Sequence, residues 1–213
     1  MTLEAMIFDM DGTLLHTMPD LALAANQALR RMGFPERSHD EMLACMGLGG
    51  RQMVELIVPA EATAAQRERT FELWRDLYIE SDYALTAPFE GIPEALRDLR
   101  ARGLKLGILS NKFDAGVQLL ANRHFPGMFD AVRGDEPPMP RKPDPTSLLF
   151  MLDQLGVSPD DAAYVGDATV DVRTARNASV KAVGVAWGYD AVSPLPIDEL
   201  DAYAHTPSEL LRL

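Results

Sequence analysis

The chain has 213 residues, 47% of them hydrophobic, which is enough to bury a core in one domain with a large insertion or in two small domains. Its 32 acidic residues outnumber 20 lysines and arginines, and the net charge of -12 argues against a nucleic-acid partner because phosphate backbones need clustered positive charge. No apolar run approaches the roughly 20 residues that cross a bilayer, so we expect a cytoplasmic protein with no membrane partner.

The first predicted element is a buried strand over Ala5–Phe8, which ends directly before Asp9 and Asp11. Gly12 permits a tight turn there, and the alternation of the pleat starts both carboxylates on the same side of the backbone. Two carboxylates at one strand tip suit a cation and a phosphate. A strand end with solvated acids is the alternative, and a short D-x-D motif taken alone favours that alternative.

A helical segment follows, because the apolar side chains after residue 17 recur at helical spacing. Pro19 opens an amphipathic helix, and Gly33 ends it. We expect helices over residues 19–32, from about residue 40, over residues 51–57 and over residues 62–83. No strand-like alternation interrupts them, so residues 17–86 are predicted to form a small helical bundle inserted after the first strand.

After Pro88 the pattern alternates between strands and helices, apart from a rigid proline-rich loop over residues 137–145. Strands are expected over residues 104–109, 129–133, 162–165 and 181–186, and helices over residues 92–102, 115–123, 146–155, 170–178 and 207–213. This alternation predicts an α/β fold with a parallel sheet covered on both faces. Such sheets bind ligands at the carboxyl ends of their strands, where the sequence puts Asp9, Ser110, Asp135 and Asp167.

Four separate motifs occur in one order along the chain. They are D-M-D-G-T from Asp9, the hydrophobic run into Ser110, R-K-P-D-P from Arg141, and G-D-A-T-V-D from Gly166 to Asp171. Together, with the helical insertion after the first, they resemble the haloacid dehalogenase superfamily of aspartate-dependent phosphatases over nearly the whole chain. The resemblance implies a Rossmann-like three-layer core built from residues 1–16 and 87–213, with an all-α cap domain over residues 17–86.

Phosphoryl transfer needs a nucleophile, neutralisation of phosphate charge and a proton for the departing oxygen. Asp9 is the candidate nucleophile, because its aspartyl-phosphate splits one hydrolysis into two easier displacements. Asp11 is the candidate that protonates the leaving alkoxide and later takes a proton from water.

A cation is expected at the same place, because the carboxylates of Asp9, Asp11 and Asp167 would otherwise repel one another. Oxygen ligands favour Mg²⁺ over zinc, and the scattered histidines give no zinc pattern. The resemblance implies that Asp9 and Asp167 ligate the ion through carboxylates and Asp11 through its backbone carbonyl. It makes Asp171 a supporting acid.

Lys142 lies in the proline-rich loop, which is a suitable way to hold one ammonium over developing phosphoryl charge. A solvated lysine is the alternative. The Ser110 hydroxyl and the Asn111 amide complete the predicted phosphate site, although Ser-Asn after a strand is also ordinary turn chemistry. Gly12 and Thr13 of the first motif are also expected to bind substrate.

Within this superfamily the chain most resembles phosphoglycolate phosphatases, in D-G-T-L-L-H-T-M-P-D-L from Asp11, G-L-G-G from Gly47, S-N-K from Ser110 and V-A-W-G-Y from Val185. The resemblance implies hydrolysis of a small phosphorylated metabolite by a monomer or homodimer. Phosphatases of pyrophosphate, nucleoside monophosphates or sugar phosphates, and a β-phosphoglucomutase-like phosphomutase, are the alternatives. A non-catalytic scaffold that kept the fold is disfavoured by the complete set of acids, lysine and hydroxyl.

Arg51, after the glycine-rich turn, is a candidate for a substrate carboxylate or second phosphate because its guanidinium offers two parallel donors. A solvated helix face is an equal alternative for Arg51. Three residues depart from the family pattern: His16 where an acid is usual, Ala168 where a hydroxyl is common, and Asn177 where a small residue is usual. His16 is expected to alter contacts of the hinge between the two domains.

Overall fold

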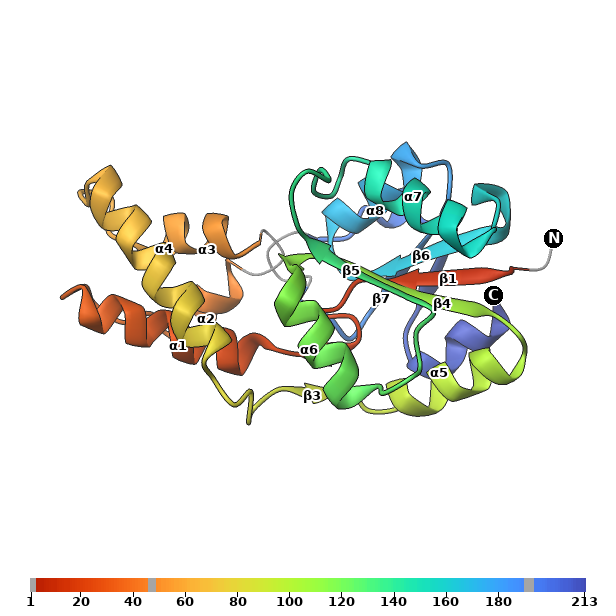
Figure 1. The fold of residues 1–213 in the computed structure, drawn as a ribbon, viewed down its shortest axis with the longest axis horizontal. Helices are drawn as coiled ribbons and strands as arrows, with labels where there is room; N and C mark the ends of the chain where they lie inside the picture. The colour runs from red at the N-terminus through yellow and green to blue at the C-terminus, as the bar shows by residue number, and fades with distance from the viewer. Residues whose placement is uncertain (1–2, 46–48, 190–193) are drawn as a thin grey trace.

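The computed structural model describes residues 3–45, 49–189 and 194–213 (Figure 1). Its centre is a six-stranded, fully parallel sheet in the order β5-β4-β1-β6-β7-β8. The strands are β1 (Ala5–Phe8), β4 (Lys105–Phe113), β5 (Ala131–Asp135), β6 (Ala162–Gly166), β7 (Lys181–Val185) and β8 (Ala202–Ala204). The predicted α/β fold with a parallel sheet is confirmed.

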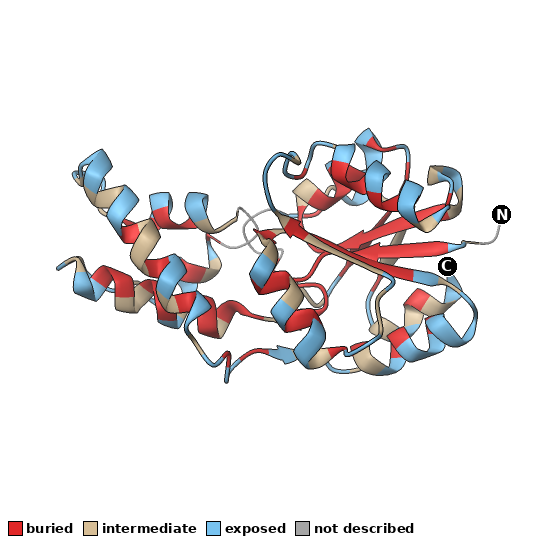
Figure 2. Cartoon of the chain, in the orientation of Figure 1, coloured by how far each residue is buried: buried red, intermediate tan, exposed pale blue. Residues whose placement is uncertain are grey.

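Strand β1 lies in the interior of the sheet, and its side chains alternate between two hydrophobic clusters. Met6 and Phe8 pack in the larger cluster with the helices of one face, whereas Ala5 and Ile7 pack in the second cluster with the helices of the other face. Helices α5 (Ile92–Ala101) and α6 (Asp114–His124) cover the first face, and α7 (Thr146–Leu155) and α8 (Thr169–Asn177) cover the second. Figure 2 shows the strands buried between these two helical layers.

The helices α1 (Met18–Arg31), α2 (His39–Leu43), α3 (Gly50–Ile57) and α4 (Ala64–Ile79) form a helical bundle beside the carboxyl ends of the strands, away from both termini (Figure 1). The chain enters this bundle after β2 (Leu15–His16) and returns through β3 (Ala87–Pro88), and these two short strands pair antiparallel. We propose that residues 17–86 are a cap domain. Within the described ranges, no helix is both long and apolar enough to span a membrane.

Buried hydrogen bonds hold the two chain segments that connect the helical bundle to the core. The carboxylate of Asp20 on α1 accepts hydrogen bonds from the Thr86 hydroxyl (2.7 Å) and the Leu85 backbone N–H (3.1 Å). On the other side of the hinge, Nδ1 of His16 lies 2.9 Å from the Tyr189 hydroxyl. His16, in β2, therefore contacts Tyr189 of the core, and burial lowers the pKa of its imidazole. Its effect on the hinge stays a prediction.

The structure differs from the predicted elements in several places. β4 continues through Phe113 with an irregular register after Leu109, so that the polar run from Ser110 lies within the strand and not after it. Helix α4 ends at Ile79, before the predicted residue 83. The C-terminal helix is a 3-10 helix, Pro207–Arg212, and β8 is too short to give an alternating pattern.

The role of Asp20 at the hinge gives the first testable prediction. Asp20→Ala leaves the buried Thr86 hydroxyl and the Leu85 N–H without their acceptor, so we expect the free energy of unfolding to fall by about 2 kcal/mol. Denaturant titration measures this change. The control Asp98→Ala, on the exposed side of α5, is expected to unfold like the wild type. Equal midpoints for the two variants would contradict the assigned role.

Candidate active site

Asp9 extends β1 by one residue, and its backbone N–H donates to the Val165 carbonyl of β6 at 2.9 Å. This pairing fixes the carboxylate at the tip of the sheet. Burial raises the pKa of Asp9 to about 6, Lys142 opposes that rise, and the neighbouring Asp171 and Asp11 add to it.

The Lys142 ammonium is buried among acceptors from three elements. Its Nζ donates to Oδ1 of Asp171 (2.7 Å) and to the Tyr164 hydroxyl (2.9 Å), and it lies 3.0 Å from Oδ1 of Asp9. Burial alone would lower the pKa of Lys142, but Asp171 and Asp9 more than offset burial and hold this pKa well above its usual value. The solvated alternative for Lys142 is therefore excluded, because the residue is 5% exposed.

Two amides hold the loop that carries Lys142. The side chain of Asn111 accepts from the Lys142 backbone N–H (2.8 Å) and donates to the Lys142 carbonyl (3.1 Å). Asn177 on α8 donates to the Pro143 carbonyl at 2.9 Å. The structure thus uses the Asn111 side chain to position Lys142, and phosphate binding by Asn111 stays a prediction. It also gives Asn177, a departure from the family pattern, a local role.

Asp167 follows β6 and is held by the first motif and by the turn after β7. Its Oδ1 accepts from the Thr13 hydroxyl (2.9 Å), and its Oδ2 accepts from the Tyr189 backbone N–H (2.7 Å). Burial, then the charges of Asp171 and Asp9, raise the pKa of Asp167 to about 8 despite these two hydrogen bonds. The predicted substrate-binding residue Thr13 therefore directs its hydroxyl to Asp167.

Gly12 lies in the left-handed region, at φ +87°, and a Cβ at this position would lie 2.2 Å from Oδ2 of Asp167. Any side chain would displace the Asp167 carboxylate or strain the turn. The first motif therefore needs glycine at this position for the close approach of the turn to Asp167.

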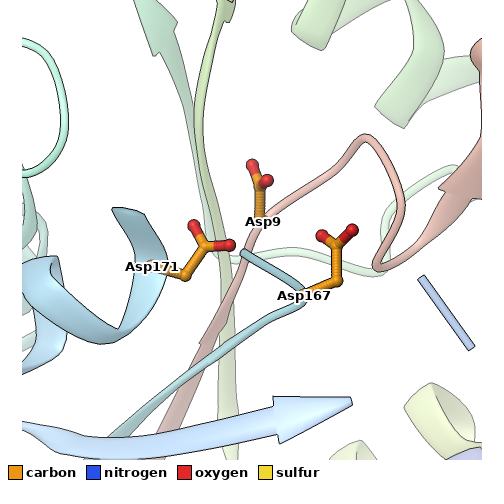
Figure 3. Close-up of side chains that lie close together, drawn as sticks. All are labelled: Asp9, Asp167 and Asp171. Atoms are coloured by element: carbon orange, nitrogen blue, oxygen red, sulfur yellow. The ribbon is translucent and has the colours of Figure 1, made fainter. Parts of the chain in front are cut away.

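Three elements bring the carboxylates of Asp9, Asp167 and Asp171 to one place (Figure 3), with one oxygen of each within 4.8 Å of the others. Asp171 has both oxygens engaged, one by Lys142 and the other by the Ala168 backbone N–H at 3.0 Å. In contrast, the buried Oδ1 of Asp9 accepts no hydrogen bond from the described part of the chain, although Lys142 lies beside it as an ion pair. Asp171 is therefore the better candidate for the partner of Lys142, and Asp9 has an oxygen available to a metal ion. Both oxygens of Asp167 also accept hydrogen bonds, from Thr13 and Tyr189, so metal ligation by Asp9 and Asp167 stays a prediction.

Asp11 is paired with a residue that the sequence analysis did not assign to the site. The two Asp11 oxygens lie 3.1 and 3.2 Å from Nζ of Lys112, whose side chain is buried. Lys112 follows Ser110 in the S-N-K run, so its position just beyond the predicted end of the strand at residue 109 was the available signal. Its pairing with Asp11, far away in the sequence, gave no signal.

A cavity of about 160 Å³ lies between the strand tips and the helical bundle. The core lines it with Asp9, Asp11, Ser110, Asn111, Lys112, Asp135, Arg141 and Lys142, and the bundle lines it with Gly49, Gly50, Arg51, Phe71 and Trp74, among others. The predicted turn begins at Gly47 and Leu48, which lie outside the described residues. The cavity is therefore lined both by predicted catalytic residues of the core and by the described part of the predicted glycine-rich turn, Gly49 and Gly50.

Arg51 lines this cavity, but its guanidinium already has a bidentate partner. Its Nη1 and Nη2 lie 2.5 and 3.0 Å from the two oxygens of Glu68, and the guanidinium stacks over the Phe71 ring at 4.0 Å. A substrate anion could pair with both Nη1 and Nη2 in the same way only by displacing Glu68 from Arg51. Substrate binding by Arg51 stays a prediction.

Two further residues of the site were not anticipated. The Tyr164 hydroxyl donates to the Leu109 carbonyl (2.5 Å) and accepts from Lys142, which gives the buried ammonium a neutral partner. Arg141 pairs with Asp135 (3.1 Å) and donates to the Asn111 carbonyl (3.0 Å) at the cavity wall. For Tyr164, the sequence signal was a tyrosine in an otherwise apolar strand.

The arrangement offers a carboxylate nucleophile, a facing ammonium, a second acid in the same cavity, and two carboxylates placed to share a cation. These groups suit the transfer of an anionic group such as a phosphoryl group, because the ammonium and a cation would neutralise its charge.

Comparison with known proteins agrees with this chemistry. A family model described as "Haloacid dehalogenase-like hydrolase" matches residues 6–185. A phosphoglycolate phosphatase of Aquifex aeolicus is 32% identical over 99% of this chain and 96% of its own length, and one of Pseudomonas putida is 35% identical over 92% and 76%. A crystal structure from Lactobacillus delbrueckii subsp. bulgaricus superposes with a TM-score of 0.90 at 30% identity, covering 99% and 97% of the two chains.

The matched region runs from β1 through β7 and so includes every residue placed at the strand tips above. The chain belongs to the haloacid dehalogenase-like hydrolase family and is an enzyme of that class.

Proposed function

We propose that this enzyme hydrolyses a small phosphomonoester in a Mg²⁺-dependent reaction through an aspartyl-phosphate at Asp9. One observation carries the proposal: the Asp9 carboxylate, at the tip of β1, faces the Lys142 ammonium at 3.0 Å and lies beside the Asp167 carboxylate. A nucleophile, a neutralising ammonium and a place for a metal ion would thus lie together at the strand tips, where Asp9 and Lys142 line the cavity.

The residues present fit a hard divalent cation. Three buried carboxylates lie together, and the Lys142 ammonium pairs with two of them, Asp9 and Asp171, so ionisation of all three would leave negative charge without compensation. Burial and the repulsion between these carboxylates raise the pKa values of Asp9 and Asp167 when no metal ion is bound. Asp9 and Asp167 would hold Mg²⁺ through carboxylate oxygens and Asp11 through its backbone carbonyl. The bound ion would stabilise negative charge on the phosphoryl oxygens.

The protein residues carry the two displacements as follows. A carboxylate oxygen of Asp9 attacks phosphorus, and the bond from phosphorus to the ester oxygen breaks. Asp11 enters this step protonated on one oxygen, while Lys112 donates to the other, and gives its proton to the departing oxygen. Asp11 then takes a proton from water, whose oxygen attacks phosphorus and releases phosphate from Asp9. With a pKa of about 6, Asp9 is mostly ionised at neutral pH, as a nucleophile must be.

The substrate is proposed from the relatives and from the cavity. The relatives named phosphoglycolate phosphatase cover nearly the whole chain, and the cavity between strand tips and helical bundle is small and lined by several basic side chains. We therefore propose 2-phosphoglycolate as the first compound to test. Movement of the bundle toward the strand tips would exclude water during the reaction.

A substrate panel tests the function directly. Purified wild type with Mg²⁺ is expected to release phosphate from 2-phosphoglycolate, and Asp9→Asn is expected to lower kcat by roughly three orders of magnitude or more because the nucleophile is lost. The panel also includes pyrophosphate, mononucleotides and sugar phosphates, with phosphate release as the readout.

The matched control is Asp153→Asn on the exposed side of α7, which is expected to keep wild-type rates. No phosphate release from any compound would sink the proposal. Isomerisation of a sugar phosphate without net phosphate release would identify a phosphomutase instead.

The metal site predicts a distinctive pH dependence of stability. The pKa of Asp167 in the folded protein, about 8, lies above the reference of about 3.9, so the folded state binds more protons between these values. Stability from this group is therefore full below about pH 4 and is lost as pH rises through about 8. Without metal, Asp167→Asn is expected to melt above the wild type near pH 8, with a smaller difference near pH 5.

Added Mg²⁺ should reverse this order at pH 8, because binding to the folded state raises the melting temperature of the wild type but not that of Asp167→Asn. Differential scanning calorimetry at both pH values measures the effect. Parallel pH profiles for the two proteins, unchanged by Mg²⁺, would show that Asp167 is neither strained nor a ligand.

A further inference from the structure

The ion pair between Asp11 and Lys112 joins the first motif to the end of β4. Both Asp11 oxygens face the same ammonium, at 3.1 and 3.2 Å, and the Lys112 side chain is 3% exposed whereas that of Asp11 is 20% exposed. Lys112 therefore fixes the direction of a partly exposed carboxylate that opens into the cavity. A side chain that transfers a proton to one atom of a substrate needs such a fixed direction.

Lys112 itself is held from the helical bundle. Its Nζ lies 4.4 Å from the centre of the Tyr78 ring on α4, which is cation–π distance. Such contacts are strongest when they are shielded from water, and Tyr78 is fully buried. The bundle thus supplies a second face to the ammonium that holds Asp11.

Other aromatic rings hold the Tyr78 ring in place. Trp74, one turn earlier on α4, stacks nearly parallel to it, with centroids 5.9 Å apart. Phe113, next to Lys112 on β4, meets it edge-on at 6.0 Å. Tyr78 therefore contacts both sides of the interface between bundle and core, and a shift of α4 would change its place over Lys112.

We propose that Lys112 is a positioning residue that aims Asp11 at the leaving oxygen, and that the Tyr78 ring of the helical bundle holds Lys112 in that position. The proposal rests on the proposed function. Under this proposal, proton donation by Asp11 depends on the position of the helical bundle, because Tyr78 holds Lys112 only when α4 lies over the strand tips. A direct role of Lys112 in binding substrate is the competing interpretation.

The leaving group separates these two interpretations. An alkyl phosphate needs a proton on its departing oxygen, whereas p-nitrophenyl phosphate releases a stable anion and needs little help from an acid. With Lys112→Met we expect the rate of leaving-group release in the first turnover, at saturating alkyl substrate from the panel, to fall roughly 10- to 100-fold with KM changed less than about threefold. The first-turnover rate on p-nitrophenyl phosphate is expected to change less than about threefold; the first turnover is compared because both substrates share the later step, in which Asp11 takes a proton from water.

A double-mutant cycle checks that Lys112 acts through Asp11. In an Asp11→Asn background, Lys112→Met is expected to have little further effect on kcat, because the group that it positions is gone. Lys105→Met, at the opposite end of the same strand and exposed, is the matched control and is expected to keep wild-type kinetics.

Two substitutions test the contribution of the bundle. Tyr78→Leu removes the ring face and is expected to lower kcat on the alkyl substrate in the same direction as Lys112→Met. Tyr78→Phe keeps the ring and is expected to keep the wild-type ratio of rates on the two substrates, because the buried Tyr78 hydroxyl has no hydrogen-bond partner in the described residues. Melting temperatures of all variants verify that they are folded.

The outcomes are distinguishable. A wild type that releases phosphate from neither substrate defeats the proposed function itself. An active wild type in which Lys112→Met raises KM at a constant first-turnover rate, or lowers that rate equally on both substrates, defeats only the role of Lys112. Additive effects of Asp11→Asn and Lys112→Met would also overturn it, and a Tyr78→Leu variant with wild-type selectivity would overturn the role of the bundle.

Discussion

The buried Lys142 ammonium is the interaction on which the site depends. Carboxylates that are removed from water repel one another and lose solvation, and such a cluster persists only where positive charge compensates it. Lys142 is in contact with Asp9 and Asp171 together, and much of the surrounding structure serves to keep it there. The Asn111 amide holds its backbone, and Tyr164 adds a neutral partner. One ammonium does not neutralise three carboxylates, and a divalent ion would neutralise the remaining negative charge.

The topology explains why residues so distant in sequence meet at this point. Parallel strands all end at the same edge of the sheet, and the neighbours of β1 are β4 and β6. Asp9 follows β1, Asp167 follows β6, and the loop with Lys142 leaves from β5 beyond β4. The chain leaves β1 through the first motif and β2 and then forms the helical bundle, so the bundle covers the same edge of the sheet. The first motif, which carries Asp9, and the helical bundle that covers the site therefore come from adjacent segments of the chain.

Much of this was accessible from the sequence, for a physical reason. Asp9 and Asp167 each follow a short apolar run, which is the signal of a buried strand ending at the ligand-binding edge, and the structure brings the two carboxylates together, with Asp9 beside Lys142. The pairing of Asp11 with Lys112, the clamp by Asn111 and the pairing of Arg51 with Glu68 were not accessible. Each depends on the packing of side chains that are distant along the chain, and spacing carries no information on such contacts. The continuation of β4 was missed because its last residues are polar.

The position of the divalent ion tests the central claim most directly. Mn²⁺ substitutes for Mg²⁺ at oxygen sites and is visible by anomalous diffraction, so crystals grown with Mn²⁺ would locate it. The account predicts one peak at coordination distance, about 2.0–2.3 Å, from carboxylate oxygens of Asp9 and Asp167, with Lys142 still paired to Asp171. A peak elsewhere, or none between Asp9 and Asp167 at saturating Mn²⁺, would contradict it.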